Sequence, residues 1–129
     1  MLIVLPPSET KAEPPRRGRP VDVGGLSFPE LTAARESLLD ALARTSARPD
    51  AHAVLGAPPG AAREVEQNVH LLHLPCRPAL EVYRGVLYDA LDVGGLSTAA
   101  RRRAAGRLVV VSALWGMLRP RDRVPAYRL

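Results

Sequence analysis

The sequence predicts an α/β fold, in which a mixed or mostly parallel sheet is combined with helices. Two short apolar runs, at residues 1–5 and 107–112, are predicted to be buried strands, because each is continuous and the second is rich in β-branched residues. Segments with helical spacing of apolar residues lie between them. Strands separated by helices usually pair in parallel, so we expect these two strands to be neighbours whose carboxyl ends share one edge of the sheet.

The first helix is expected to begin at residues 27–30 (Ser-Phe-Pro-Glu), where a capping box is combined with a proline in the first turn. Phe28 is predicted to act as a staple that packs into the core. The helix should end near Ser46. Its apolar face is predicted from the residues at helical spacing, which are Leu31, Ala34, Leu38, Leu39 and Leu42.

Three further helices are expected at residues 50–55, 60–72 and 97–106, and the last is predicted to be capped by Ser97. Residues 79–92 fit two structures, an extended segment or a turn followed by a helix. The segment before the first helix, residues 6–20, is rich in proline and charge and is expected to form a loop. The apolar side of the helix at residues 60–72 is predicted to consist of Ala61, Val65, Val69 and Leu72.

The hexapeptide DVGGLS occurs twice, at residues 22–27 and 92–97. A duplicated module would be similar over a unit of at least about 20 residues, so this short repeat does not indicate duplication. We expect both copies to form a glycine turn that leads into a serine N-cap.

Positive charge is concentrated in the last part of the chain. Residues 1–100 carry ten basic and twelve acidic side chains, whereas residues 101–129 carry eight arginines and a single acid, Asp122. Such a basic segment favours a polyanionic partner, either nucleic acid or a phosphorylated ligand. The alternative is a solvated arginine-rich surface, because the whole chain prefers arginine, with seventeen Arg and one Lys.

Other bulk properties exclude several classes of protein. The chain has 129 residues, which is one domain at most, and it has no apolar stretch long enough to span a membrane. The opening residues lack the basic segment of a signal peptide. A single cysteine, Cys76, excludes an intramolecular disulfide framework and fits a reducing cytosol.

Lys11 is the only lysine of the chain. A composition that otherwise uses arginine suggests that this position needs a compact ammonium rather than a planar guanidinium. Together with Ser8 and Thr10 it forms a loop suited to binding phosphate, although the loop lacks the glycines of a P-loop. The alternative is an exposed, solvated lysine.

The aromatic residues offer a second candidate feature. Tyr83 and Tyr127 are each followed by an arginine, a combination that stacks on bases while neutralising phosphates. They could equally be core residues whose hydroxyl groups find partners. For Tyr88 and Trp115 we expect the core role.

A metal site and an acid–base pair are the weaker candidates. His70, His73 and Cys76 have the right side chains for zinc or iron, but their spacing is uncommon and a fourth ligand is lacking nearby. We therefore expect no obligate metal. Glu9 and Asp122 are candidate acid–base groups, although loop carboxylates are usually just solvated.

Three blocks of the sequence resemble the YaaA family of peroxide-stress proteins. Residues 110–129 are similar to the family pattern L-S-G-L-Y-G-L-L-R-P-x-D-x-x-x-P-Y-R-L, and they read VVSALWGMLRPRDRVPAYRL. Residues 83–91 (YRGVLYDAL) resemble its Y-x-G-x-x-Y-x-x-L block. Residues 1–11 resemble its opening strand and the loop that follows. Trp115 stands where the family usually has tyrosine, and Ala113 where it has glycine.

The resemblance implies an unusual α/β fold with a basic cleft and a helix-hairpin-helix element, and a cytosolic protein that binds DNA and limits damage driven by free iron. Duplex DNA is then the expected partner, without a cofactor or a membrane. Candidate residues for binding nucleic acid or phosphate are Ser8, Lys11, Tyr83, Arg84, Arg119, Arg123, Tyr127 and Arg128. Structural roles are expected for the other motif positions, Gly85, Tyr88, Gly116, Pro120 and Asp122.

An enzyme is the alternative, although a binding protein is favoured. It would act on a nucleotide or a nucleic-acid base through a pocket at the strand ends, with Glu9 or Asp122 as acid or base and Lys11 as phosphate anchor. Members of the family are about twice as long, so residues 1–129 are expected to be a single YaaA-like domain that is truncated at its C-terminal end.

Overall fold

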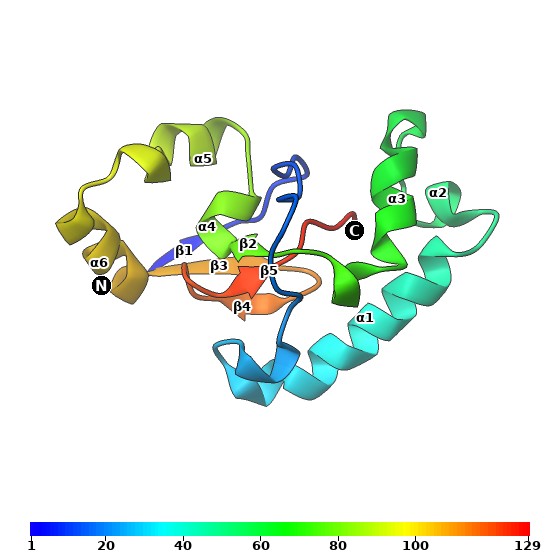
Figure 1. Cartoon of the computed structure of the whole chain (residues 1–129), viewed down its shortest axis with the longest axis horizontal. Coiled ribbons are helices and arrows are strands. Elements are labelled where there is room, and N and C mark those ends of the chain that lie inside the picture. Colours follow the sequence, from blue (N-terminus) through cyan, green and yellow to red (C-terminus); the bar gives the residue numbers. More distant parts are fainter.

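Two small β-sheets lie in the middle of the molecule, with helices on both flanks (Figure 1). The computed structural model describes all residues from 1 to 129. The strands are β1 (Ile3–Leu5), β2 (Arg77–Pro78), β3 (Leu108–Ser112), β4 (Gly116–Leu118) and β5 (Arg123–Val124). The helices are α1 (Thr32–Ser46), α2 (Ala51–Val54), α3 (Ala62–Asn68), α4 (Ala79–Val82), α5 (Val86–Leu91) and α6 (Thr98–Arg107).

The larger sheet confirms the α/β prediction. Its strand order is β1-β3-β4, and β1 pairs with β3 in parallel, with Ile3 opposite Leu108 and Leu5 opposite Val110. The hairpin partner β4 pairs with β3 in the antiparallel sense, so the sheet is mixed. The smaller sheet consists of β2 and β5, paired antiparallel.

The prediction that the first strand is buried was wrong. Strand β1 is at the edge of its sheet, where Ile3 is 39% and Val4 58% exposed, and only Leu5 is buried. The apolar run identified the strand correctly but not its position, because an edge strand and a central strand have the same hydrophobicity in the sequence.

The predicted apolar face of helix α1 is confirmed in part, because Leu39 and Leu42 are buried as expected. Its buried residues are Arg35, Leu39, Leu42 and Ser46, whereas Ala34 and Leu38 are exposed. The expected capping box is absent. The Ser27 hydroxyl donates a hydrogen bond to Asp122 and does not accept one from a backbone amide of the helix. A short 3-10 turn, Pro29–Leu31, precedes α1, and Phe28 is only half-buried, with a left-handed φ of 61°.

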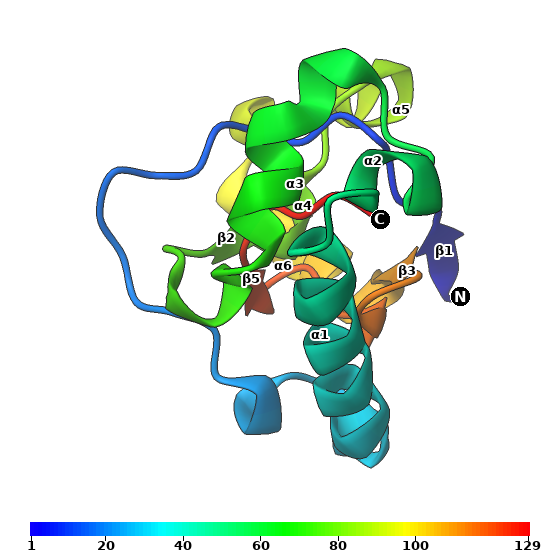
Figure 2. The same ribbon diagram turned by 90° about the vertical axis from the view of Figure 1, so that its right-hand side faces the viewer.

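The expected helix at residues 60–72 is broken into three pieces. A 3-10 turn (Pro59–Ala61), helix α3 and a second 3-10 turn (Leu71–His73) follow one another. Residues Val69 and Leu72, predicted to be buried, are exposed, and the buried positions are Ala61, Val65, Asn68 and Leu71. Figure 2 shows α3 lying beside α1 and α2, so these three helices form one flank of the molecule.

The ambiguous segment at residues 79–92 is a pair of short helices, α4 and α5, separated by extended backbone at Tyr83. Gly85 precedes α5 with a φ of 116°, a conformation that favours glycine. Helix α6 is capped as predicted, since Ser97 Oγ accepts from the amide of Ala100 at 3.2 Å.

The two DVGGLS copies form the same 3-10 turn, at Val23–Gly25 and Val93–Gly95. Only the second copy leads into a serine cap, because Ser27 is held by Asp122, a residue far away in the sequence. The glycine turn was therefore predicted correctly, and the cap in only one of the two copies.

The hydrophobic core is centred on β3, β4, β5 and α4. Its most deeply buried members are fully inaccessible, and they are Ala79, Tyr83, Val110, Leu114, Trp115, Leu118 and Val124. No helix of the structure is both long enough and apolar enough to cross a membrane.

Candidate functional site

The carboxyl ends of β1 and β3 lie side by side at one edge of the sheet, as the parallel pairing requires. The loop after β1 runs against residues 82–84, where Lys11 and Tyr83 form an antiparallel bridge. The amide of Ala12 donates to the carbonyl of Val82 at 2.7 Å, and the amide of Arg84 donates to that of Thr10 at 2.9 Å. These bonds fix the position of the Lys11 loop.

A chain of three buried hydroxyl groups lies beneath this loop. The Tyr127 hydroxyl is 2.6 Å from Ser112 Oγ and 3.0 Å from the Tyr83 hydroxyl. Ser112 Oγ also accepts from the amides of Leu114 and Trp115, so both of its lone pairs are used and its own proton is donated to Tyr127. Burial raises the pKa of Tyr83 and Tyr127, which keeps both hydroxyl groups protonated.

The rings of these tyrosines are not available for stacking on bases. Tyr83 is completely buried and Tyr127 is 6% exposed, and the two rings pack edge to face. Of the two roles left open by the sequence, the structure therefore supports the core role for both. Tyr88 and Trp115 are buried as expected, and the Tyr88 hydroxyl donates to the carbonyl of Pro6 at 2.5 Å.

Lys11 lies over the ring of Tyr127, which packs against the ring of Tyr83, and we call these two rings the tyrosine platform. Its Nζ is 4.5 Å from the centre of the Tyr127 ring and donates to the carbonyl of Glu9 at 3.2 Å. Burial lowers the pKa of Lys11 to about 8, the neighbouring Arg128 guanidinium acts in the same direction, and the Glu9 carboxylate opposes them. None of the three ion pairs of the molecule includes Lys11.

Asn68, on α3, binds the backbone of Arg128, a residue that lies close to Lys11. Its side chain accepts from the amide of Arg128 at 2.9 Å and donates to the carbonyl of the same residue at 2.7 Å. This two-point contact ties the C-terminal segment to the first helical flank. Arg128 and Lys11 line the same cavity.

The cavity has a volume of about 210 Å³ and is formed by the Lys11 loop, α3 and the C-terminal segment. Its charged lining consists of Glu9, Lys11, Glu13, Arg63, Glu64 and Arg128. Arg63 and Glu13 approach each other at 3.9 Å, whereas Lys11 and Arg128 have no acidic partner. We refer to Lys11, Arg128 and this cavity as the Lys11 site.

The predicted site residues separate into two groups. Ser8, Lys11, Tyr83, Tyr127 and Arg128 gather at or beneath the Lys11 site, where Ser8 Oγ accepts from the Arg84 amide at 3.2 Å. The side chain of Arg84 is directed elsewhere, into a hollow lined by acidic residues, which are Glu81, Asp89 and Asp92.

Arg119, Asp122 and Arg123 belong to a different part of the molecule. The Arg119 guanidinium lies 5.3 Å above the centre of the Phe28 ring. Asp122 accepts from the Ser27 amide and hydroxyl, at 3.1 and 2.9 Å, and from the Arg119 amide at 2.8 Å. Its carboxylate thus joins two loops, which leaves the acid–base role predicted for it without support.

Two further motif positions have local structural reasons. Gly116 has a φ of 66°, and an added Cβ would meet Leu31 at 2.9 Å, so a side chain there would strain the start of β4. Pro120 is buried beside the loop that Asp122 closes.

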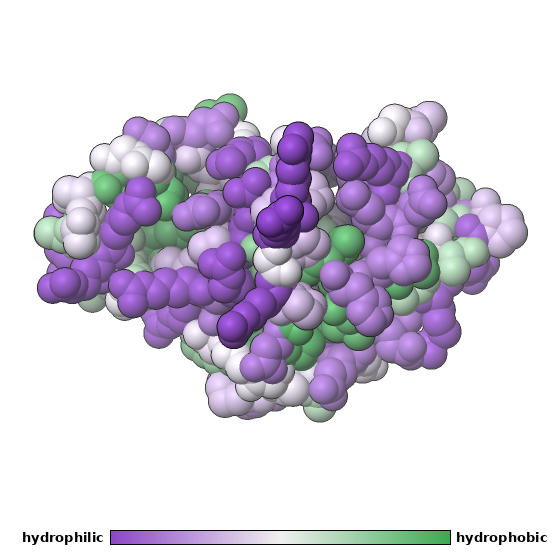
Figure 3. Space-filling model, viewed as in Figure 1, coloured by the Kyte–Doolittle hydropathy of each residue, from purple (hydrophilic) through white to green (hydrophobic).

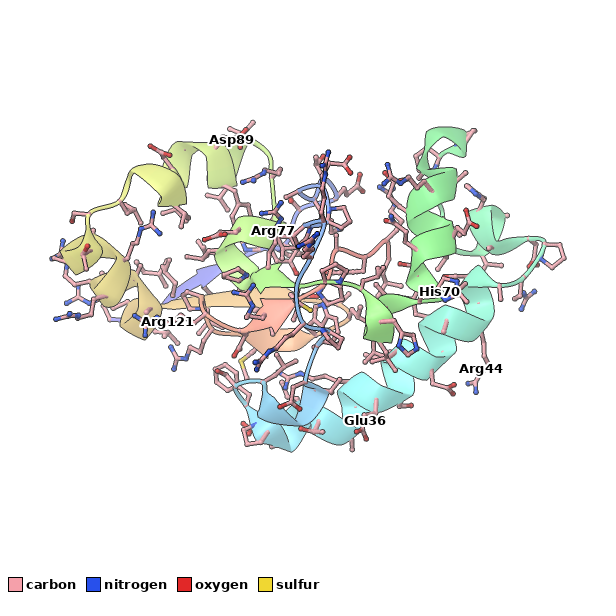
Figure 4. All side chains as sticks on the ribbon, viewed as in Figure 1. Glu36, Arg44, His70, Arg77, Asp89 and Arg121 are labelled. Atoms are coloured by element: carbon pink, nitrogen blue, oxygen red, sulfur yellow. The ribbon has the colours of Figure 1, made fainter.

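The arginines of the last part of the chain are largely exposed. On α6 these are Arg101, Arg102, Arg103 and Arg107. Arg121 lies beside α6 (Figure 4). It lines one hollow together with Arg101 and a second hollow together with Arg19 and Arg123. Figure 3 shows hydrophilic side chains over α6 and along the loop that crosses the middle of this face. We call Arg19, Arg101, Arg121 and Arg123 the basic surface.

The histidine and cysteine cluster does not form a metal site. His70 and His73 are exposed on the 3-10 turn after α3, while Cys76 is buried, with Sγ directed to the carbonyl of Leu74. No group of three or more histidine, cysteine or acidic side chains is arranged to hold a metal ion. Burial raises the pKa of Cys76 to about 11, so the thiol is protonated at neutral pH.

Three important polar residues were missed by the sequence reasoning. Ser112 ends an apolar strand, Asn68 lies on the buried side of α3, and Arg35 lies on the buried side of α1. The signal was present for Arg35, since it is four residues before Leu39 and four after Leu31, which places a charged residue on the apolar side of the helix.

Comparison with known proteins gives the family. The family model described as peroxide stress protein YaaA matches residues 1–129. The chain belongs to this family. It is 52% identical to a UPF0246 protein of Streptomyces coelicolor, over 99% of this chain and 50% of the relative. It is 46% identical to a UPF0246 protein of Corynebacterium efficiens and 44% identical to one of Corynebacterium glutamicum, each over 100% of this chain and 50% of the relative.

The chain thus spans about half the length of the curated relatives it matches. The resemblance to the YaaA family expected from the three sequence blocks is confirmed over the whole chain. Both the Lys11 site and the basic surface are built entirely from residues within the part that matches.

Proposed function

We propose that this YaaA family protein binds duplex DNA through unpaired basic side chains. One observation carries the proposal. Residues 101–129 hold eight arginines, and none of them takes part in any of the three ion pairs of the molecule. Arginines that are exposed and not neutralised by acids of the same chain are suited to a phosphate backbone.

The Lys11 site and the basic surface have different roles in this proposal. The arginines of the basic surface contact successive phosphates, because guanidinium groups bind phosphate oxygens in pairs. Lys11 and Arg128 hold one further phosphate above the tyrosine platform. Base stacking has no part in it, because the rings of Tyr83 and Tyr127 are buried.

Salt dependence of binding tests this proposal. The affinity of the purified protein for a duplex oligonucleotide should fall as a power of the salt concentration, with a slope of about 0.9 for each phosphate neutralised. Affinity that stayed the same from low to physiological salt would contradict phosphate contacts. A variant with Arg101, Arg121 and Arg123 replaced by glutamine should lose most of the slope. Replacing Arg44 and Arg48, which are paired with acids on α1 and after it, is the matched control.

The protection from peroxide that the family description suggests is proposed to follow from DNA binding in the cytosol. Covering DNA would limit damage driven by free iron without the protein holding the metal. Strand breaks made in plasmid DNA by iron and peroxide should decrease when the protein is added, and should not decrease with the arginine-to-glutamine variant.

An enzyme that acts on a nucleotide or nucleic-acid base is the second candidate, and the cavity beside Lys11 favours it. Glu9 lines this cavity and remains available as an acid or base, whereas Asp122 is occupied with three hydrogen bonds. Turnover that is lost in Lys11→Ala while bulk DNA binding persists would support an enzyme. Equal loss of both would support simple binding.

A further inference from the structure

We propose that Lys11 is a reactive amine, which forms an imine with an aldehyde carried on a phosphorylated sugar. The ring-opened sugar of an abasic site in DNA is one source of such an aldehyde, and a free sugar phosphate is the other. The inference rests on the proposed function in one respect, since the same site receives the phosphate. An amine is required for this chemistry, and Lys11 is the only lysine in a chain with seventeen arginines.

The surroundings of the amine leave it free to react. Nζ uses one of its hydrogens on the Glu9 carbonyl, and it lies over the face of the Tyr127 ring. The Tyr127 hydroxyl points away into the core, where Ser112 and Tyr83 bind it. No acidic side chain pairs with Lys11, so no ion pair must be broken before the nitrogen lone pair is exposed.

Partial burial, helped by one neighbouring cation, favours the neutral form of this amine. Arg128 lies on the C-terminal segment and Arg63 on α3, while Glu9, Glu13 and Glu64 are the acidic groups that line the cavity. Burial lowers the pKa of Lys11 most, Arg128 acts in the same direction and the Glu9 carboxylate opposes them, so that the pKa falls to about 8. Desolvation and a neighbouring cation are the two means by which lysines become nucleophiles in imine-forming enzymes.

The size of the cavity restricts the ligand. A volume of about 210 Å³ is below the range of roughly 300–1,000 Å³ that drug-sized ligands occupy, and it suits a single sugar or one sugar of a longer strand. Arg128 lines the cavity and takes part in no ion pair. It is therefore placed to bind the phosphate while the aldehyde enters toward Lys11.

The proposed step is balanced without any further reagent. The lone pair of neutral Nζ attacks the aldehyde carbon, a C–N bond forms, and the C=O π electrons move to oxygen, which takes up a proton. Nitrogen releases one proton as oxygen takes one up, which gives a neutral carbinolamine. The carbinolamine then loses its hydroxyl group together with the second proton of nitrogen as water, and a C=N bond remains. One amine and one aldehyde give one imine and one water, and hydrolysis reverses the step.

Reductive trapping tests the proposal directly. The chain would be incubated with sodium cyanoborohydride and four separate probes, which are an abasic duplex, the matched intact duplex, glyceraldehyde 3-phosphate and glyceraldehyde. Peptide mapping by mass spectrometry separates an adduct at Lys11 from one at the α-amino group of Met1. At pH 8 the neutral fraction of Lys11 should be roughly 100-fold above that of an ordinary lysine.

We expect an adduct on Lys11 with the abasic duplex or with glyceraldehyde 3-phosphate, and much less with glyceraldehyde, which lacks the phosphate. An adduct with the duplex probe identifies DNA as the source, and one with the small phosphate alone identifies a free sugar phosphate. Lys11→Arg keeps the positive charge and should abolish the adduct, and Arg128→Gln should weaken it. No adduct at Lys11 with either phosphorylated aldehyde, or equal labelling with and without phosphate, would overturn the proposal.

The same proteins separate this inference from the proposed function. Salt-sensitive binding of the intact duplex by the wild type, together with an absence of trapping on its Lys11, would leave DNA binding in place and remove the imine. Trapping of glyceraldehyde 3-phosphate by a wild type that does not bind duplex DNA would do the opposite. Thermal melting of wild type and Lys11→Arg should agree, because the side chain is half-buried and makes a single hydrogen bond.

Discussion

Arg35 and Lys11 are two positively charged side chains that lie partly or fully below the surface of this protein. They differ greatly in the number of hydrogen-bond partners that each has. Arg35 is 1% exposed, and its guanidinium donates to the carbonyls of Trp115, Ser27 and Met117 at 2.7–2.8 Å, with a longer bond to Phe28. Lys11 is half-buried and has one carbonyl and one ring face.

The difference indicates which cation is structural and which is available for a ligand. Arg35 connects α1 to the β3–β4 hairpin and to the loop before the helix, and its main hydrogen-bonding nitrogens are already used. Lys11 keeps hydrogen-bonding capacity that faces a cavity. A buried charge whose donors are all used holds a fold together, whereas one with unused donors can accept a partner.

Removing Arg35 should have the largest effect. Arg35→Ala leaves the buried carbonyl of Trp115 and two part-buried carbonyls without their donor, and it removes a side chain that fills the core, so we expect the free energy of unfolding to fall by about 3–5 kcal/mol, as measured by urea denaturation. Arg44→Ala is the matched control on the same helix. Arg44 pairs with Asp40 on the exposed side and points away from the body (Figure 4), so its loss should cost less than about 0.5 kcal/mol. An equal fall in the free energy of unfolding for Arg35→Ala and Arg44→Ala would contradict the structural role assigned to Arg35.

The platform under Lys11 should give the next largest effect. Tyr127→Phe deletes the hydroxyl shared with Ser112 and Tyr83, and we expect it to cost about 1–3 kcal/mol of unfolding free energy. Tyr88→Phe deletes a single bond, to the Pro6 carbonyl, and should cost about 1 kcal/mol. A smaller loss for Tyr127→Phe than for Tyr88→Phe would show that the hydroxyl chain does not support the site.

The effect of pH on stability should distinguish Lys11 from every other basic group. Its folded pKa of about 8 is below the value of 10.5 expected for the unfolded chain, so the unfolded state holds more protons between these limits. At pH values below about 8 the buried amine is charged, and its burial lowers the free energy of unfolding by the full amount. The free energy of unfolding should therefore rise as the pH increases from about 8. Lys11→Met should remove this rise, as measured by urea titrations.

The window for that measurement ends near pH 9, because burial raises the pKa of the Cys76 thiol from 9.0 to about 11. At higher pH the tyrosines act in the same sense as Cys76, because burial raises the pKa of Tyr83 and Tyr127 and raises that of Tyr88 to about 12. Their unfolded forms then lose protons that the folded forms keep, which lowers stability as pH rises. A rise that is identical in wild type and Lys11→Met would show that another group causes it.

The comparison of Arg35 with Lys11 also shows which features of the fold and of the site could be predicted from the sequence. The parallel pairing of β1 with β3 could be predicted from local apolar runs and the order of the elements along the chain. The shared edge at which both strands end follows from that pairing. Lys11 was identifiable because it is the one lysine. These signals are local, or they concern composition.

The rest depended on contacts between distant residues. Arg35 is bound by carbonyls about eighty positions away, and Ser27 is taken from its predicted capping role by Asp122, ninety-five positions away. Ser112 and Asn68 are likewise polar residues whose partners come from the C-terminal segment. A polar side chain on an apolar face indicates burial, but the partner that satisfies it is known only when the fold has brought both together.

The most direct test of the contrast measures folding and DNA binding in one variant. Lys11→Ala should unfold within about 1 kcal/mol of the wild type, because it loses one hydrogen bond and one cation–π contact. Its duplex-DNA affinity at pH 7 should be weaker, and its salt slope should be smaller by about 0.9, the value for one phosphate. An unchanged slope and affinity in a stably folded Lys11→Ala protein would contradict the assignment of Lys11 to binding.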